Sequence, residues 1–286
     1  MQTLTFILPL FNDWKSLQKL LLGIDKQLEA LKKKGDVLIV DDNSYIRPNL
    51  NILIYKKIKK IKILKLKMNL GSQKAISIGM SYLKKKKIKT IITILDSDGE
   101  DDYTKIPEMV NKAYEYPKKV IVSCRTKRKE GLLFNFFYSV HKIILFIFSG
   151  KWIDYGNFSS FNSNNLNKML SNNDSWFALS SCLAKNCSIY KMFAERKKRF
   201  FGKSKLSFPD LIFHAMRVNA VFKVRIFFLS LIYSYVSFYL IENFIILSFF
   251  LSFILIFNVM LVITYILVKP KKFLARMKLV NKIKLV

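Results

Sequence analysis

The sequence predicts an α/β domain with a mostly parallel central sheet, followed by two apolar helices near the C-terminus. As far as residue 125, short apolar or β-branched runs alternate with amphipathic stretches, which is typical of layered α/β domains. Residues 226–268 are different, because they carry one charge, at Glu242. We therefore expect a domain over residues 1–225, a transmembrane hairpin over 226–268 and a basic cytoplasmic tail over 269–286.

Five short strands are expected before residue 125. Each is rich in apolar and β-branched residues, which favours a strand with little exposure to water. In chain order they are Thr3–Leu8, Val37–Val40, Ile61–Lys67, residues 90–95 and Val120–Cys124. In Ile61–Lys67 apolar residues alternate with lysines, so this strand is expected nearer the sheet edge.

Helices are expected between these strands. The first begins at Asn12 or Asp13, both of which are favourable N-cap residues, and runs to about Leu31. The second opens at the Asn-Leu-Gly-Ser sequence 69–72, and the third covers about 104–115.

A further helix, Leu132–Phe148, is aromatic and aliphatic but contains polar residues. It is expected to be either a core helix or a helix lying in the membrane interface, and the interface is the preferred interpretation.

The composition narrows the class of protein. The 286 residues have a net charge of +30 and are 51% hydrophobic, which excludes a disordered chain and favours an anionic partner such as a membrane surface or a phosphorylated substrate. A nucleic-acid binder is disfavoured because the lysines are dispersed and form no aromatic stacking platform. Cys124, Cys182 and Cys187 are odd in number and lack metal-ligand spacing, which favours free thiols in a reducing compartment. His141 and His214 are the only histidines, so a histidine-rich metal site is excluded.

The apolar segment is long enough for two membrane crossings. As one helix it would extend roughly 64 Å, whereas the hydrocarbon core is only about 30 Å thick. A turn near Glu242-Asn243 divides it, and Lys or Arg flanks both outer ends. This charge pattern places both ends on the cytoplasmic side of an inner or plasma membrane. The alternative is a soluble helical hairpin. No signal peptide is expected before the first strand.

Two carboxylates follow the strand at 90–95. Asp96 and Asp98 are spaced i, i+2 at the C-terminal end of that strand, where open α/β sheets bind ligands. Two hard oxygen ligands on one turn can share Mg²⁺ or Mn²⁺ with a substrate diphosphate. The alternative is a solvated turn, because Asp-Ser-Asp-Gly is also good turn chemistry.

A succession of motifs makes the chain recognisable. In order these are PLFND (9–13), VDDNS (40–44), NLGSQKA (69–75), DSDGEDD (96–102), Arg125, DYGNF (154–158) and RFFGKSK (199–205). The succession resembles the family 2 glycosyltransferases, and within them the polyprenyl-phosphate glycosyltransferases, including dolichyl-phosphate mannose synthases. The resemblance runs from residue 3 to about 225 and implies a GT-A nucleotide-sugar-binding fold there.

The resemblance also assigns residues to the donor site. Pro9, Phe11 and Asp13 match the donor-site motif of the first strand, although the family usually has Glu at the last of these positions. Asp41 and Asp42 match the pair that contacts base and ribose, with simple turn formation as the alternative.

The same resemblance implies the catalytic residues. Asp96 and Asp98 match the metal-binding pair, and Glu100 stands where relatives often carry Gln. Arg125 and Arg199 match basic positions near the transferred phosphate groups, with ordinary surface arginines as the alternative.

The resemblance implies three further substrate-binding residues. Gly71 belongs to NLGSQKA, and Ser204 and Lys205 complete the Gly-x-Ser-Lys pattern. One departure concerns the 132–148 helix, where some relatives have an arginine and this chain has Ser139. His141 or Lys142 is left to supply that positive charge.

The implied activity is that of a membrane-anchored, inverting glycosyltransferase. It would use a divalent cation and move a sugar from a nucleotide-sugar donor to a polyprenyl phosphate, undecaprenyl or dolichyl, at the cytoplasmic face. A phosphate monoester has a second pKa near 6, so at cytosolic pH the acceptor phosphate is already mostly a dianion. The dianion can attack the anomeric carbon of the sugar without a strong general base. A hydroxyl acceptor on a glycan or lipid would need one, and only Asp174 and Glu195 are candidates between residues 159 and 200. That hydroxyl transferase and a non-catalytic membrane scaffold are the alternatives.

Overall fold

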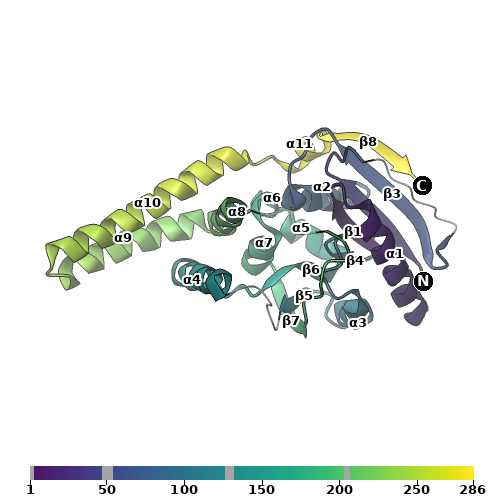
Figure 1. The fold of residues 1–286 in the computed structure, drawn as a ribbon, viewed down its shortest axis with the longest axis horizontal. Helices are drawn as coiled ribbons and strands as arrows, with labels where there is room; N and C mark the ends of the chain where they lie inside the picture. Colours follow the sequence, from purple (N-terminus) through teal and green to yellow (C-terminus); the bar gives the residue numbers. More distant parts are fainter. Residues whose placement is uncertain (1–2, 47–53, 126–131, 203–206) are drawn as a thin grey trace. The chain divides into compact units, whose positions relative to one another are not determined.

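The computed structural model describes residues 3–46, 54–125, 132–202 and 207–286, and they form two compact units. The sheet unit comprises Met1–Arg128, Asp154–Ser204 and Lys271–Val286, and the helical unit comprises Lys129–Ile153 and Lys205–Pro270. Figure 1 shows the elements of both units.

In the sheet unit, the described residues form a mixed sheet whose strands run mostly parallel. Its order is β7-β5-β6-β4-β1-β2-β3-β8, with β6 and β8 antiparallel to their neighbours. The strands are β1 (Leu4–Leu10), β2 (Gly35–Asp41), β3 (Ile58–Leu66), β4 (Ile91–Ile94), β5 (Lys119–Arg125), β6 (Tyr155–Asn162), β7 (Ser188–Ala194) and β8 (Val280–Leu285). The helices are α1 (Trp14–Ala30), α2 (Ser72–Lys85), η2 (Tyr103–Lys105), α3 (Ile106–Glu115), η3 (Ser163–Asn165), α5 (Leu166–Met169), α6 (Asp174–Phe177), α7 (Leu179–Asn186) and α11 (Phe273–Met277). The predicted α/β class with a mostly parallel sheet is confirmed.

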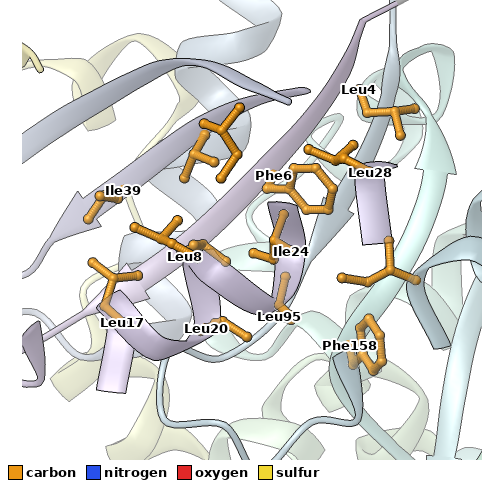
Figure 2. Packing of buried hydrophobic residues seen from close by; sticks show 14 of the residues in the cluster. Leu4, Phe6, Leu8, Leu17, Leu20, Ile24, Leu28, Ile39, Leu95 and Phe158 are labelled. Atoms are coloured by element: carbon orange, nitrogen blue, oxygen red, sulfur yellow. The ribbon is translucent and has the colours of Figure 1, made fainter. Parts of the chain in front are cut away.

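Strand β1 is buried on both faces, which explains its continuous apolar sequence. On one face, Phe6 and Leu8 belong to the same buried cluster as α1 and α3 (Figure 2). Side chains of α1 three and four residues apart, among them Leu17, Leu20 and Ile24, form its buried stripe. Burying each such side chain contributes roughly 1.5–3 kcal/mol.

Helix α2 covers the other face of the sheet. Ile7, which alternates with Phe6 and Leu8 along β1, points toward α2. A Cβ at Gly79 would lie 2.9 Å from the Ile7 side chain and 3.0 Å from that of Val40. The small residue therefore allows the helix to approach the sheet closely.

The helical unit contains α4 (Leu132–Ser149), α8 (Phe208–Ala220), α9 (Lys223–Leu240) and α10 (Phe244–Val268). Helices α9 and α10 are long and apolar enough to cross a membrane. The turn between them contains Asn243, whose side chain accepts from the first free N–H groups of α10. The Asn258 amide donates to the Ser230 hydroxyl at 2.8 Å, which joins the two helices. The predicted pair of apolar C-terminal helices is thus present.

The last residues do not form a simple tail. Where we expected only a basic segment over 269–286, the chain forms α11 and then β8. Strand β8 pairs antiparallel with β3, with Ile283 opposite Leu64, and lies beside it in Figure 1. Strand β3 therefore lies one strand in from the sheet edge, and Lys271–Val286 belongs to the sheet unit.

Candidate active site

Acidic residues from three strands converge at one edge of the sheet. Strands β1, β2 and β4 run parallel, so their C-terminal ends lie at the same edge. Asp13 follows β1, Asp41 ends β2 with Asp42 beside it, and Asp96 and Asp98 follow β4. The sequence-predicted carboxylates are thus brought to the ligand-binding edge of the sheet.

A short segment after β7 lies over these carboxylates. We call residues 196–201 the strap and residues 96–102 the acidic turn. The backbone N–H of Lys197 donates to the carbonyl of Glu100, and that of Phe200 donates to the carbonyl of Asp98, both at 2.9 Å. Arg196 also forms a salt bridge with the Glu100 carboxylate. Main-chain and side-chain bonds together fix the strap on the acidic turn.

Gly99 allows the strap to approach this closely. Its φ is +85°, in the left-handed region that glycine adopts without strain. A Cβ at this position would lie 2.4 Å from the Phe200 ring. That ring also faces the Lys19 ammonium, 4.7 Å from its centroid. The aromatic residue of the strap therefore occupies space that only glycine leaves open.

Arg199 bridges two of the site carboxylates. One terminal nitrogen, Nη1, donates to Asp98 Oδ2 at 2.9 Å, and the other, Nη2, donates to Asp13 Oδ2 at 2.6 Å. Asp13 stands at the N-cap position of α1, but its side chain makes no cap hydrogen bond. The structure thus brings together Asp13, Asp98 and Arg199, which are far apart in the sequence.

The surroundings of Asp98 favour a cation. Burial, and then the neighbouring charge of Asp96, raise the pKa of Asp98 to about 6, against the opposing effect of Arg199. The described ranges contain no group of three or more His, Cys, Asp or Glu side chains arranged to hold a metal ion. Two carboxylates fit Mg²⁺ or Mn²⁺ when substrate phosphates complete the shell, because Mg²⁺ usually binds through one or two carboxylates plus phosphates.

Asp96 is held by a buried amide pair that the sequence analysis did not identify. The Asn157 Nδ2 donates to both Asp96 oxygens, at 3.0 and 3.3 Å. The Asn157 Oδ1 accepts from Gln73 Nε2 at 2.9 Å, and Gln73 Oε1 accepts from the Leu179 N–H at 2.7 Å. Gln73 lies in the NLGSQKA motif and Asn157 in the DYGNF motif. The signal that could have identified them is an amide side chain among the buried residues of a helix or strand.

Asp42 shapes the loop before α2. Its carboxylate accepts from the N–H groups of Leu70 and Gly71, each at 2.7 Å. Burial raises the pKa of Asp42, and these two hydrogen bonds oppose that rise. Gly71 is the N-cap of α2 with a φ of +87°, so the carboxylate and the glycine together define this turn.

The remaining residues that the sequence predicts for the donor site lie around the first two strands. The Asp41 Oδ1 accepts from the Ser44 N–H at 2.8 Å. Pro9 is buried in β1 opposite Val40, and the ring of Phe11 packs edge-on to Tyr45, with 6.3 Å between centroids.

Three predicted residues cannot be placed by their side chains. Arg125 ends β5, so its backbone lies in the sheet, but its side chain is outside the described part of the chain. Ser204 and Lys205 lie outside the described residues.

In α4, Ser139 stands where some relatives have an arginine, and the two candidates to replace its charge, His141 and Lys142, differ in their surroundings. Burial lowers the pKa of His141 to about 4, so the imidazole is neutral at pH 7. The Lys142 Nζ lies 4.9 Å from the centroid of the Trp152 ring. The lowered pKa of His141 disfavours it as the source of a positive charge on α4, and Lys142 remains the other candidate.

Comparisons with known proteins identify relatives of this chain. The family model for "Glycosyl transferase family 2" matches residues 5–197. The chain is 26% identical over 131 residues to the dodecaprenyl-phosphate galacturonate synthase of Rhizobium johnstonii, covering 45% of this chain and 38% of that protein. It is also 26% identical over 133 residues to the uncharacterized glycosyltransferase YkcC of Bacillus subtilis, covering 46% and 39% respectively. The chain thus spans less than two fifths of the length of these curated relatives.

Solved structures share the fold at low sequence identity. Glucosyl-3-phosphoglycerate synthase from Mycobacterium tuberculosis, crystallised with Mn²⁺, UDP and phosphoglyceric acid, superposes with a TM-score of 0.54 at 11% identity. The match covers 79% of this chain and 78% of that one. This likeness establishes a GT-A-like fold.

Proposed function

The chain belongs to glycosyl transferase family 2, and we propose that it moves a sugar from a nucleotide-sugar donor to a polyprenyl phosphate. The observation that carries this proposal is the convergence of Asp13 and Asp98 on Arg199, with Asp96 beside Asp98, at the C-terminal edge of the parallel strands. Paired carboxylates beside an arginine suit a substrate that has a diphosphate and a divalent cation. The donor would lie across the ends of β1 and β2, near Pro9, Phe11, Asp41 and Asp42.

Asp96 and Asp98 would hold the Mg²⁺ or Mn²⁺ ion, which supplies Lewis-acid stabilisation of the leaving nucleoside diphosphate. Arg199 can bind phosphate oxygens through two parallel N–H donors. To do so it must exchange at least one carboxylate partner for phosphate. Asn157 keeps Asp96 oriented throughout.

The surroundings of the two carboxylates that are candidates for a general base support a phosphate acceptor. Asp174 forms an ion pair with Lys185 at 3.1 Å and accepts from the Asn186 amide at 3.0 Å. Glu195 is exposed. A phosphate dianion needs no base, and the Rhizobium relative is named for a dodecaprenyl-phosphate product. Direct attack by this dianion would invert the anomeric configuration.

The acceptor's lipid chain accounts for the two apolar helices. In this proposal α9 and α10 cross the inner or plasma membrane, and the sheet unit lies on the cytoplasmic side. Lys223 and Arg225 lie in the first turn of α9, and Lys269, Lys271 and Lys272 follow α10, so both outer ends of the hairpin are basic, as the positive-inside rule requires. Within the sheet unit, Arg125 is the proposed cationic contact of the acceptor phosphate.

The acceptor assay tests this function. Membranes containing the full chain are incubated with labelled UDP-, GDP- and CDP-sugars and with either undecaprenyl phosphate or undecaprenol. We expect labelled lipid with the phosphate, from one nucleotide class, and no labelled lipid with the alcohol. Transfer to the alcohol or to a soluble hydroxyl acceptor, with none to the phosphate, would establish the hydroxyl transferase instead.

A further inference from the structure

Arg276 is a fully buried arginine delivered to the sheet unit by α11. It is 0% exposed, although arginine is almost never completely buried without partners. Helix α11 follows the apolar hairpin in sequence, and yet it packs against α2 beneath the sheet. An arginine kept in such a place must satisfy its donors within the fold.

The partners of Arg276 are neutral oxygens. Its Nη1 donates to the hydroxyls of Ser77 at 2.8 Å and Ser175 at 3.1 Å, and these two hydroxyls lie 3.0 Å apart. Its Nε donates to the Lys271 carbonyl at 2.9 Å. The guanidinium carbon also lies 5.4 Å from the centroid of the Trp176 ring. The side chain thus joins α2 to α6 instead of neutralising an acid.

Both helices lead from Arg276 to the same amide. Ser77 lies one helical turn after Gln73 in α2, and Ser175 lies in α6, which precedes Leu179. Gln73 bonds both the Leu179 N–H and Asn157, and Asn157 bonds the Asp96 carboxylate. Every one of these polar side chains except Asp96 is buried. Two buried hydrogen-bonded groups, one around Arg276 and one around Gln73, are therefore linked through the backbone of α2 and of the segment from α6 to Leu179, and the second group reaches the candidate metal site.

We propose that Arg276 is a positioning residue for Asp96, acting through α2, α6 and the Gln73–Asn157 pair. Arg276 fixes the separation of α2 and α6. This separation sets the position of the Gln73 amide, which donates to the Asn157 Oδ1 and so orients Asn157 in the described network. The C-terminal segment is thereby part of the catalytic apparatus. Its role in metal binding rests on the proposed function.

A purely structural role would have a different signature. An arginine that only supports the fold would, when replaced, lower the melting temperature and reduce every binding property by the same factor. A positioning residue changes the metal-dependent property selectively. Alteration of groups that orient metal ligands typically costs 10–100-fold in metal affinity.

The experiment measures nucleotide binding with and without metal. Full-length protein in detergent is titrated by calorimetry with UDP, GDP and CDP, in Mn²⁺ and in EDTA, together with thermal unfolding. The variants are Arg276→Met, the milder Arg276→Lys and Ser77→Ala, and the control Lys278→Met, which removes an exposed cation just after α11. We expect the affinity gained from Mn²⁺ to fall about tenfold in Arg276→Met, less in Ser77→Ala, and not at all in the control. Affinity in EDTA should not change.

A double-mutant cycle traces the route. If Arg276 acts through the amide pair, Ser77→Ala should add nothing to the loss caused by Asn157→Ala, because both disturb one network. Additive losses, or an unchanged Mn²⁺ effect in folded Arg276→Met and Ser77→Ala proteins, would overturn the proposal while leaving the function intact. Should Arg276→Met fail to fold, Arg276→Lys and Ser77→Ala decide the question. Wild-type protein that gains no nucleotide affinity from Mn²⁺ would overturn the metal site itself, and this inference with it.

Discussion

Asp13 and Arg199 illustrate what single residues can reveal. Asp13 follows a strand and precedes an amphipathic helix, so local chemistry predicts an N-cap, and the helix does begin after it. Its carboxylate instead binds Arg199, a residue far along the chain. Local rules place such a residue in the fold, but they contain no information about a partner brought in by the strap.

The bridging role of Arg199 leads to a prediction. In Arg199→Lys the charge remains, but one ammonium cannot reproduce the two-nitrogen bridge to Asp13 and Asp98. We expect transfer to slow by about 10²-fold, the scale of losing one preorganised electrostatic donor. Initial rates at saturating donor measure this, with the exposed Lys198→Arg as control. Full activity in Arg199→Lys would mean that the bridge has no catalytic role.

Elements differ in how far the sequence predicts them. The apolar runs that became β1, β2, β4 and β5 are buried on both faces, so their hydrophobicity alone identified them. Strand β6 was not predicted because its buried centre is polar. There Ser160 shares a hydrogen bond with Thr93 of β4 at 2.9 Å, which satisfies a hydroxyl that would otherwise disfavour burial. Strand β8 was missed because its alternating lysines are typical of an exposed tail.

The strap is held by its contact with the acidic turn, and a substitution at Gly99 in that turn tests this contact. In Gly99→Ala the new Cβ would clash with the Phe200 ring and the residue would have an unfavourable positive φ. We expect the strap to be displaced, with donor KM raised about tenfold and the melting temperature lowered by a few degrees. Gly202→Ala is the matched control, because its φ is +70° but a Cβ there meets no atom within 4 Å. If the two substitutions change donor KM and melting temperature equally, backbone strain alone explains the change, and the contact between Gly99 and Phe200 does not position the strap.

At the scale of the whole chain, the sequence predicted both the sheet and the apolar helices, because hydrophobic patterning determines each. The return of Lys271–Val286 to the sheet unit could not be predicted. It depends on an antiparallel pairing between β3 and β8, which are separated by most of the chain, and on the burial of one arginine. The choice of β3 as the pairing partner and the burial of a single arginine leave no periodic signal in the sequence.

Membrane insertion by α9 and α10 is the prediction at this scale. The full chain should remain with membranes after alkaline carbonate extraction. In Leu255→Lys/Val262→Lys, two exposed α10 side chains become cationic, and each central lysine costs about 2.5–3.5 kcal/mol in lipid. We expect this variant to be released into the soluble fraction, whereas Leu274→Lys, an exposed position in α11, should not be. Recovery of the unmodified chain in the supernatant would indicate a soluble helical hairpin.

The central claim is that Asp98 supports sugar transfer to a polyprenyl phosphate, and one rate comparison tests it directly. Labelled lipid is measured for wild type, Asp98→Asn and the surface control Glu108→Gln across Mg²⁺ and Mn²⁺ titrations. Asp98→Asn keeps the shape of the side chain but removes the charge that holds a cation beside the diphosphate. It should cost about 3–4 kcal/mol of transition-state stabilisation, roughly 10²–10³ in rate, with thermal unfolding and membrane retention unchanged. Near-normal transfer by Asp98→Asn in both metal titrations would contradict the account and reduce the carboxylate pair to a turn.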